Sequence, residues 1–206
     1  MAMYGLNKII PNRKQCYAYK NLAFGGYLFD KCTSCGRQTA IELPPTQTDA
    51  FVLDGGKQYT DFLFFGGSGL YFLVSKNVLS AFQKYGVTGY EQAIPVPLYR
   101  EKQNALIEQE AVYYLLNITG SIDLDLKAMA LKRKHVCPVC KQFDWSRQRL
   151  YTIKSVFDMS TWNQSDLCRL ASFPGYIVCS EKVKSIVEEY GFSGVSFQNE
   201  DRIFQL

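Results

Sequence analysis

Cysteine is the residue whose number and spacing in this chain indicate chemistry. Seven cysteines occur among 206 residues, and four of them form two CxxC pairs, Cys32 with Cys35 and Cys137 with Cys140. A CxxC turn places two thiolates on one knuckle of backbone, and two such knuckles complete the tetrahedral site of structural zinc. We therefore expect Cys32, Cys35, Cys137 and Cys140 to bind one Zn²⁺ per chain, with no coordination position left open for catalysis.

Two other interpretations of the CxxC pairs stay open. A redox pair of the thioredoxin type would start a helix after a buried strand, and the pairs could also be unrelated thiols. Gly36 follows Cys35 directly, and Lys141 follows Cys140, which favours a turn over a helix start. We expect the other three cysteines to be small buried apolar residues: Cys16, Cys168 and Cys179.

Catalytic side chains are scarce in the sequence. His135 is the single histidine, which leaves little room for a mechanism that needs a histidine base. The glycine-rich segment at 66–69 lacks the lysine of a phosphate-binding loop. Asp123 and Asp125 stand at strand spacing, which places them on one exposed face. We expect neither catalysis nor a small-molecule substrate.

An internal repeat organises the chain. An offset of 105 residues superposes the two CxxC pairs, and it also aligns residues 71–90 with residues 176–195. Seven of those 20 positions are identical, and Asp61 matches Asp166 at the same offset. We interpret the chain as a tandem duplication, with residues 1–105 as the first half and residues 106–206 as the second half of one compact structural unit.

Each half is predicted to fold as strand, helix, strand. In the first half, residues 71–74 suit a buried strand, Ser75 a helix N-cap, and Gly86 the left-handed residue after the helix. Residues 90–99 form the next strand, whose prolines suit an edge or an irregular strand. The second half repeats this plan with a strand at 176–179, Ser180 as N-cap, Gly191 after the helix and a final strand at 195–204.

Between the two units, residues 111–126 are rich in β-branched and aromatic side chains and are predicted to form one or two strands. Pro44 and Pro45 indicate a loop. The expected fold class is α+β, with two related strand-helix-strand halves joined by sheet and by the shared four-cysteine zinc site.

Composition and charge limit the classes of function. A hydrophobic content of 47% and an aromatic content of 15% indicate a folded core and argue against disorder. The net charge of +4 is too small to predict nucleic-acid binding. One basic segment is either a solvated surface or a docking patch for an acidic partner: Lys127, Lys132, Arg133 and Lys134. No apolar run suits a membrane span or a signal peptide, so we expect a cytoplasmic protein.

The order of these motifs resembles the double-CXXCG motif proteins, which are encoded beside bacterial polymorphic toxins and are treated as immunity proteins. The resemblance rests on CTSCG at Cys32, on CPVC at Cys137 and on the C-terminal stretch at 166–194. Lys141 stands where the motif name calls for glycine.

The resemblance implies a protein that binds a cognate toxin in the cytoplasm and neutralises it by covering its active site or locking it in an inactive shape. The partner would be the toxin protein, with no membrane and no small-molecule substrate. The alternative is a zinc-ribbon-like nucleic-acid-binding protein, in which the knuckles and Lys132–Lys134 contact phosphates.

Overall fold

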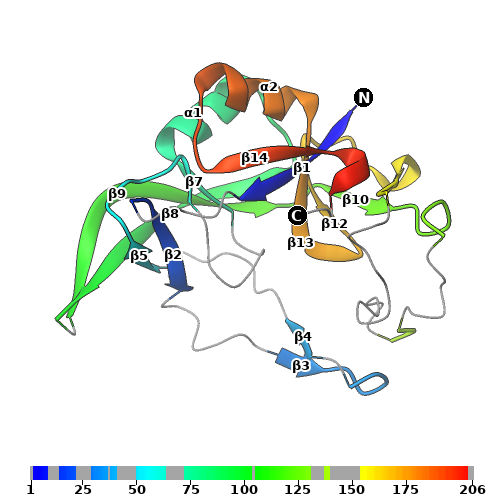
Figure 1. Cartoon of the computed structure of the whole chain (residues 1–206), viewed down its shortest axis with the longest axis horizontal. Helices are drawn as coiled ribbons and strands as arrows, with labels where there is room; N and C mark the ends of the chain where they lie inside the picture. The colour runs from blue at the N-terminus through cyan, green and yellow to red at the C-terminus, as the bar shows by residue number, and fades with distance from the viewer. Residues whose placement is uncertain are drawn as a thin grey trace.

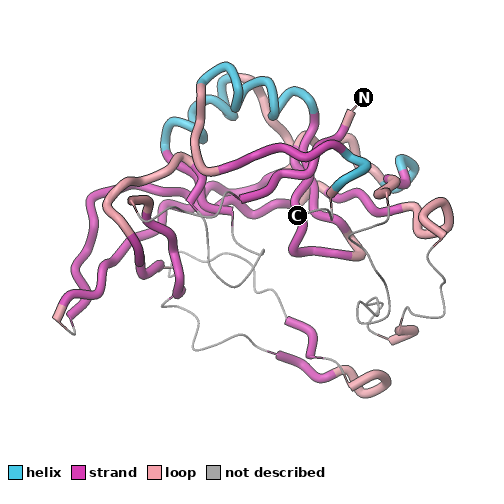
Figure 2. Tube along the Cα trace, in the orientation of Figure 1, coloured by secondary structure: helices cyan, strands magenta, loops and turns pink. Residues whose placement is uncertain are grey.

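The computed structural model describes residues 2–8, 14–21, 29–36, 38–40, 50–63, 72–103, 105–130, 137–139 and 154–203. The fold is α+β, dominated by strands (Figures 1 and 2). Its strands are β1 (Met3–Lys8), β2 (Cys16–Asn21), β3 (Phe29–Lys31), β4 (Gln38–Ala40), β5 (Phe51–Gly55), β6 (Phe62–Leu63), β7 (Phe72–Ser75), β8 (Tyr90–Lys102), β9 (Ala105–Ile118), β10 (Ser121–Leu124), β11 (Phe157–Asp158), β12 (Leu167–Leu170), β13 (Phe173–Ser180) and β14 (Val195–Asn199). The helices are α1 (Lys76–Lys84) and α2 (Glu181–Tyr190).

The strands form two curved six-stranded sheets and one small hairpin. The first sheet has the order β2-β5-β8-β9-β7-β6, and the second has the order β11-β10-β12-β13-β1-β14. The hairpin of β3 and β4 lies apart from both sheets, on the side away from the helices (Figure 1). Most neighbours are antiparallel, whereas β5 with β8 and β10 with β12 are parallel.

The N-terminal strand β1 lies in the second sheet, between β13 and β14. Its register there reproduces the register of the end of β9 in the first sheet. Met3 pairs with Ser180 in the second sheet, and Tyr113 pairs with Ser75 at the corresponding position of the first sheet. In the same way, β1 pairs with the start of β14, and β9 pairs with the start of β8. The four strands β6-β7-β9-β8 therefore have the same order as β12-β13-β1-β14.

The strand-to-helix unit of the first half is as predicted. Strand β7 is buried, and the Ser75 side chain accepts a hydrogen bond from the Val78 N–H at 3.3 Å, which caps α1. Val78, Leu79 and Phe82 form the buried face of the helix. Gly86 follows the helix with φ of 58°, the left-handed conformation expected for it.

The unit of the second half follows the same plan with two differences. Ser180 occupies the N-cap position of α2, but its side chain makes no capping hydrogen bond. The final strand ends at Asn199, so its predicted extension to 204 is wrong. Residues Glu200–Arg202 form a 3-10 helix instead, because Asn, Glu and Asp are disfavoured in strands and favour turns.

The long strands β8 and β9 confirm two further predictions. Residues 111–126 contain the end of β9 and all of β10, interrupted at Thr119 and Gly120. The proline-containing part of β8 is irregular, because its register against β9 shifts between Val96 and Leu98. The predicted loop at Pro44–Pro45 lies outside the described residues.

One hydrophobic core lies under both helices and includes residues from both sheets. Phe72 and Leu116 from the first sheet share this core with Leu167 and Ile177 from the second. The two helices lie beside each other over it (Figure 2). No helix in the described ranges is long and apolar enough to span a membrane.

Residues 105 positions apart make the same contacts across the junction of the two sheets. Asp61 accepts a hydrogen bond from the Ser75 hydroxyl at 3.1 Å, within the first half. Its second carboxylate oxygen accepts from the backbone N–H and the hydroxyl of Ser193, at 2.9 and 2.8 Å. The carboxylate therefore joins the start of one helix to the loop that follows the other helix.

Asp166 makes the reciprocal set of contacts. It accepts a hydrogen bond from the Ser180 hydroxyl at 2.7 Å, and its other oxygen accepts from the backbone N–H and the hydroxyl of Thr88 at 3.0 and 3.1 Å. Lys182 adds an ion pair at 3.1 Å. The Ser180 hydroxyl therefore donates to Asp166 as the Ser75 hydroxyl donates to Asp61.

Candidate metal centre

The first cysteine knuckle lies at the end of the β3–β4 hairpin. Cys32 directly follows β3, residues 33–35 form a turn, and the Gly36 N–H donates to the Cys32 carbonyl at 2.8 Å. Gly36 has φ of 71°, a conformation that glycine adopts without a steric penalty. The knuckle is a turn, as the zinc interpretation requires, whereas a redox pair would begin a helix.

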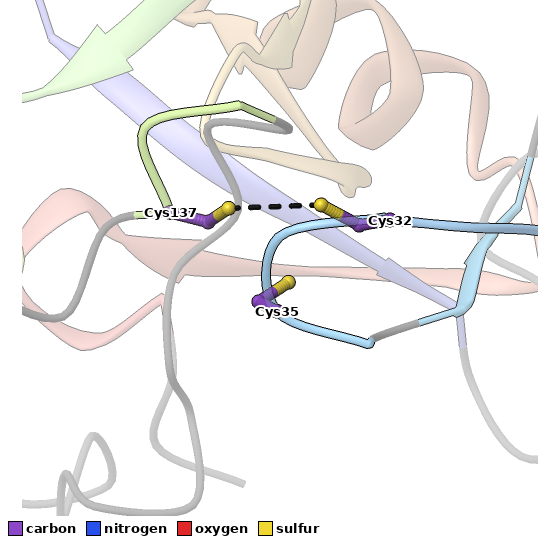
Figure 3. Close-up of side chains that lie close together, drawn as sticks. All are labelled: Cys32, Cys35 and Cys137. Carbon is purple, nitrogen blue, oxygen red and sulfur yellow. Dashed lines mark hydrogen bonds between the residues drawn. The ribbon is translucent and has the colours of Figure 1, made fainter.

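The second knuckle begins at Cys137, in a turn that includes residues 138–139. Although Cys137 lies 105 residues from Cys32, the sulfur atoms of the two residues are 3.7 Å apart. Cys35 completes the cluster, and its sulfur lies within 4.8 Å of the other two (Figure 3). The structure therefore brings together three of the four predicted ligands, and Cys140 lies outside the described residues.

The sulfur spacing fits a metal centre better than a disulfide bond. A disulfide requires an S–S distance of about 2.05 Å, which is far shorter than the distance between Cys32 and Cys137. Four thiolates bound to a tetrahedral zinc at about 2.3 Å would lie about 3.8 Å from one another. The cluster can therefore hold a metal ion without rearrangement of this pair.

The local backbone favours the thiolate form that a metal requires. Hydrogen bonds from the backbone N–H groups of Cys35 and Ser34 hold the pKa of the Cys32 thiol below its ordinary value, although desolvation opposes them. Metal ligands must be deprotonated, so a lowered pKa reduces the proton competition that a metal ion faces at this site.

Burial differs among the three ligands. Cys32 and Cys137 are each 8% exposed, whereas Cys35 is on the surface. A cluster of cysteine sulfurs is the ligand set of structural metal sites, which contribute to folding free energy. A metal ion bound by these sulfurs would hold the β3–β4 hairpin against the segment that contains Cys137.

The cysteines outside the pairs are buried, as predicted. Cys16 is 1% exposed, and Cys168 and Cys179 are fully buried. Burial raises the pKa of the Cys168 thiol to about 11 and raises that of Cys179 further. These thiols are therefore protonated and unreactive at neutral pH.

Of the basic segment, the described residues include only Lys127, which is exposed in the turn after β10. Lys132, Arg133, Lys134 and His135 lie outside the described residues, as does the glycine-rich segment at 66–69. A role for this segment in partner binding therefore stays a prediction.

The carboxylates that sequence spacing singled out serve local structure. Asp123 accepts hydrogen bonds from the backbone N–H and the hydroxyl of Ser172, at 3.0 and 2.9 Å. Asp125 accepts from the Ala128 N–H at 2.8 Å, which holds the turn after β10. The two residues bind different partners and do not form a carboxylate pair.

The chain matches none of the protein-family models, and a search of curated proteins finds no match.

Proposed function

We propose that this chain is an immunity protein, which binds a cognate polymorphic toxin in the cytoplasm and neutralises it by covering it. The observation that carries the proposal is the proximity of the Cys32 and Cys35 sulfurs to the sulfur of Cys137, which follows Cys32 by 105 residues. A centre built from two distant CxxC knuckles is the defining element of the family that the sequence resembles.

The proposed protein acts by binding rather than by catalysis. The described thiol cluster offers sulfur ligands of the structural type. Asp61, Asp123 and Asp166 are each occupied by hydrogen bonds that hold loops and helix starts in place. These carboxylates support a rigid framework, which suits a protein that presents a fixed surface to a partner.

The proposed framework is a duplicated module whose halves share one zinc ion, bound by Cys32, Cys35, Cys137 and Cys140. Two sets of contacts support the duplication. Asp61 and Asp166 make reciprocal hydrogen bonds at an offset of 105, and the strands β6-β7-β9-β8 match β12-β13-β1-β14 in order and register.

Co-expression tests the proposal. A gene for a secreted protein with a toxic C-terminal domain should lie directly upstream of the gene for this chain. Cells that produce the toxic domain should survive when this chain is co-produced, and the two purified proteins should form a stable complex. The Cys168→Ser variant, which keeps a donor for the Ser165 carbonyl, should protect as the wild type does.

Two results would contradict the immunity function. The first is the absence of protection by the wild-type chain at equal toxin expression. The second is a salt-sensitive shift of DNA or RNA by the purified chain, which would instead favour the nucleic-acid-binding alternative.

A further inference from the structure

The hairpin of β8 and β9 extends beyond the part of the fold that the two halves have in common. In the second sheet, β14 ends at Asn199 and β1 begins at Met3, which correspond by register to Pro95 and Tyr113. Beyond those points, β8 continues to Lys102, followed by the turn residue Gln103, and β9 extends back to Ala105. We call residues 99–103 and 105–108 the arm. Figure 1 shows the arm projecting away from the helices and from the second sheet.

The arm exposes two large apolar side chains. Leu106 is 47% exposed and Ile107 is 43% exposed, on opposite faces of β9. Strand β5 pairs with Leu98–Arg100 at the base of the arm. Large exposed apolar side chains on a rigid projecting element are typical of a protein–protein contact.

The cross-strand register separates the charges of the arm onto two faces. On one face, Tyr99 lies opposite Glu108 and Glu101 lies opposite Leu106. This face therefore carries two carboxylates, one aromatic ring and one leucine, and no basic residue. We call it the acidic face.

The opposite face of the arm carries its basic residues. Arg100 lies opposite Ile107, and Lys102 lies opposite Ala105. The Arg100 guanidinium donates to the Gly56 carbonyl at 2.6 Å, so it is directed toward the body of the molecule. The acidic face carries two charged side chains, Glu101 and Glu108, beside Leu106 and Tyr99, whereas Lys102 is the remaining charge of the opposite face.

We propose that the arm is the element that enters the toxin, and that it occupies a positively charged cleft with an apolar floor. The proposal rests on the immunity function proposed above. Opposite charges on the two surfaces would steer association and fix the orientation of the arm, while Leu106 and Tyr99 fill the floor of the cleft. A positively charged cleft is the kind that binds a polyanionic substrate, so the arm would exclude that substrate directly.

The test uses the toxic domain encoded directly upstream as the probe and compares two matched substitutions. Leu106→Lys places a cation on the acidic face, and Met159→Lys makes the same change at a side chain that is 45% exposed outside the arm. We expect Leu106→Lys to raise the Kd at least about tenfold and to abolish protection. Met159→Lys should do neither, and both variants should keep the wild-type Tm.

A second pair of measurements tests charge and location. Glu101→Lys combined with Glu108→Lys should slow association at low ionic strength, and the difference from the wild type should shrink as salt is added. In the wild-type complex, the backbone N–H groups of residues 105–108 should exchange more slowly than in the free chain. This exchange measurement needs no variant, so it decides the matter even where a substitution impairs folding.

Three results would overturn the proposal, and they are distinguishable. In the first, the wild type protects, the Leu106→Lys variant binds with unchanged affinity, and exchange at residues 105–108 does not change. This result overturns the arm proposal but leaves the immunity function standing. Failure of the wild type to bind the toxic domain overturns both. A wild-type dimer that Leu106→Lys converts to a monomer also overturns the arm proposal, since the arm would then join two copies of this chain.

Discussion

At the scale of single residues, Asp166 illustrates how one carboxylate can stabilise a contact between distant segments. Burial of this side chain by itself would raise its pKa. Hydrogen bonds from the Thr88 N–H, the Ser180 hydroxyl and the Lys182 ammonium outweigh burial, so its pKa lies below its ordinary value. A carboxyl whose pKa is lower in the folded state contributes stability above its unfolded-state pKa, and this contribution is lost as the pH falls through the folded-state pKa.

Replacing Asp166 by Asn should therefore lower stability in a pH-dependent way. We expect the free energy of unfolding at pH 7 to fall by about 1–3 kcal/mol, because the charged acceptor of the Thr88, Ser180 and Lys182 donors is lost. The difference from the wild type should narrow as the pH is lowered below roughly 4. Denaturant unfolding over a pH series measures this, with Glu200→Gln as an exposed control. A difference that does not depend on pH would contradict the account.

The sequence identifies Asp61 and Asp166 as matching positions but does not reveal what they do. Their decisive partners, Ser193 and Thr88, come from the opposite half of the chain. A hydrogen bond between residues 132 or 78 positions apart depends on the tertiary fold, so no local pattern predicts it. The CxxC cysteines are different, because the chemistry of thiolate and zinc indicates their mutual proximity from spacing alone.

At the scale of elements, each helix is followed by a loop that packs against the other half. The Thr88 carbonyl accepts from the Leu167 N–H at 3.0 Å, and the Ser193 carbonyl accepts from the Phe62 N–H at 2.9 Å. Gly89 and Gly194, its counterpart in the second half, allow these loops to approach the other half closely. A Cβ on Gly89 would lie 2.1 Å from the Leu167 carbonyl oxygen, which is closer than atoms can approach.

Gly89→Ala should consequently destabilise the protein much more than Gly86→Ala. Both residues have positive φ, at 93° and 58°, but a Cβ on Gly86 would meet nothing within 4 Å. We expect Gly86→Ala to lower the free energy of unfolding by about 1 kcal/mol, and Gly89→Ala to lower it by more than about 3 kcal/mol. Thermal or denaturant unfolding of the two variants measures the difference, and equal effects would contradict the close approach.

Local sequence signals predict the helices and strands better than they predict which strands pair with each other. The start and end of α1 follow from Ser75 and Gly86, which act on their own helix. The position of β1 between β13 and β14 has no such signal, because any apolar strand can pair there. The predicted extension of β14 to 204 is wrong because residues 199–202 are all polar, and this polar run forms a 3-10 helix in place of a strand.

At the scale of the whole molecule, three kinds of contact join the N-terminal and C-terminal parts of the chain. These contacts are the shared core under the helices, the reciprocal carboxylate hydrogen bonds and the thiol cluster. The proposed duplication and the proposed shared metal would explain why segments far apart in the sequence fold together. Apparent binding free energies of structural zinc in small domains are about 10–16 kcal/mol, so an occupied cluster would dominate the stability of its surroundings.

The metal content of the purified chain tests this account most directly. We predict about one zinc per chain for the wild type and for Cys168→Ser, whose sulfur lies outside the cluster. Cys32→Ser and Cys137→Ser should each lose the zinc and lower the Tm. A wild-type chain that contains no zinc, with the cluster thiols reacting freely, would contradict the shared metal centre. So would full retention of zinc by both cluster variants.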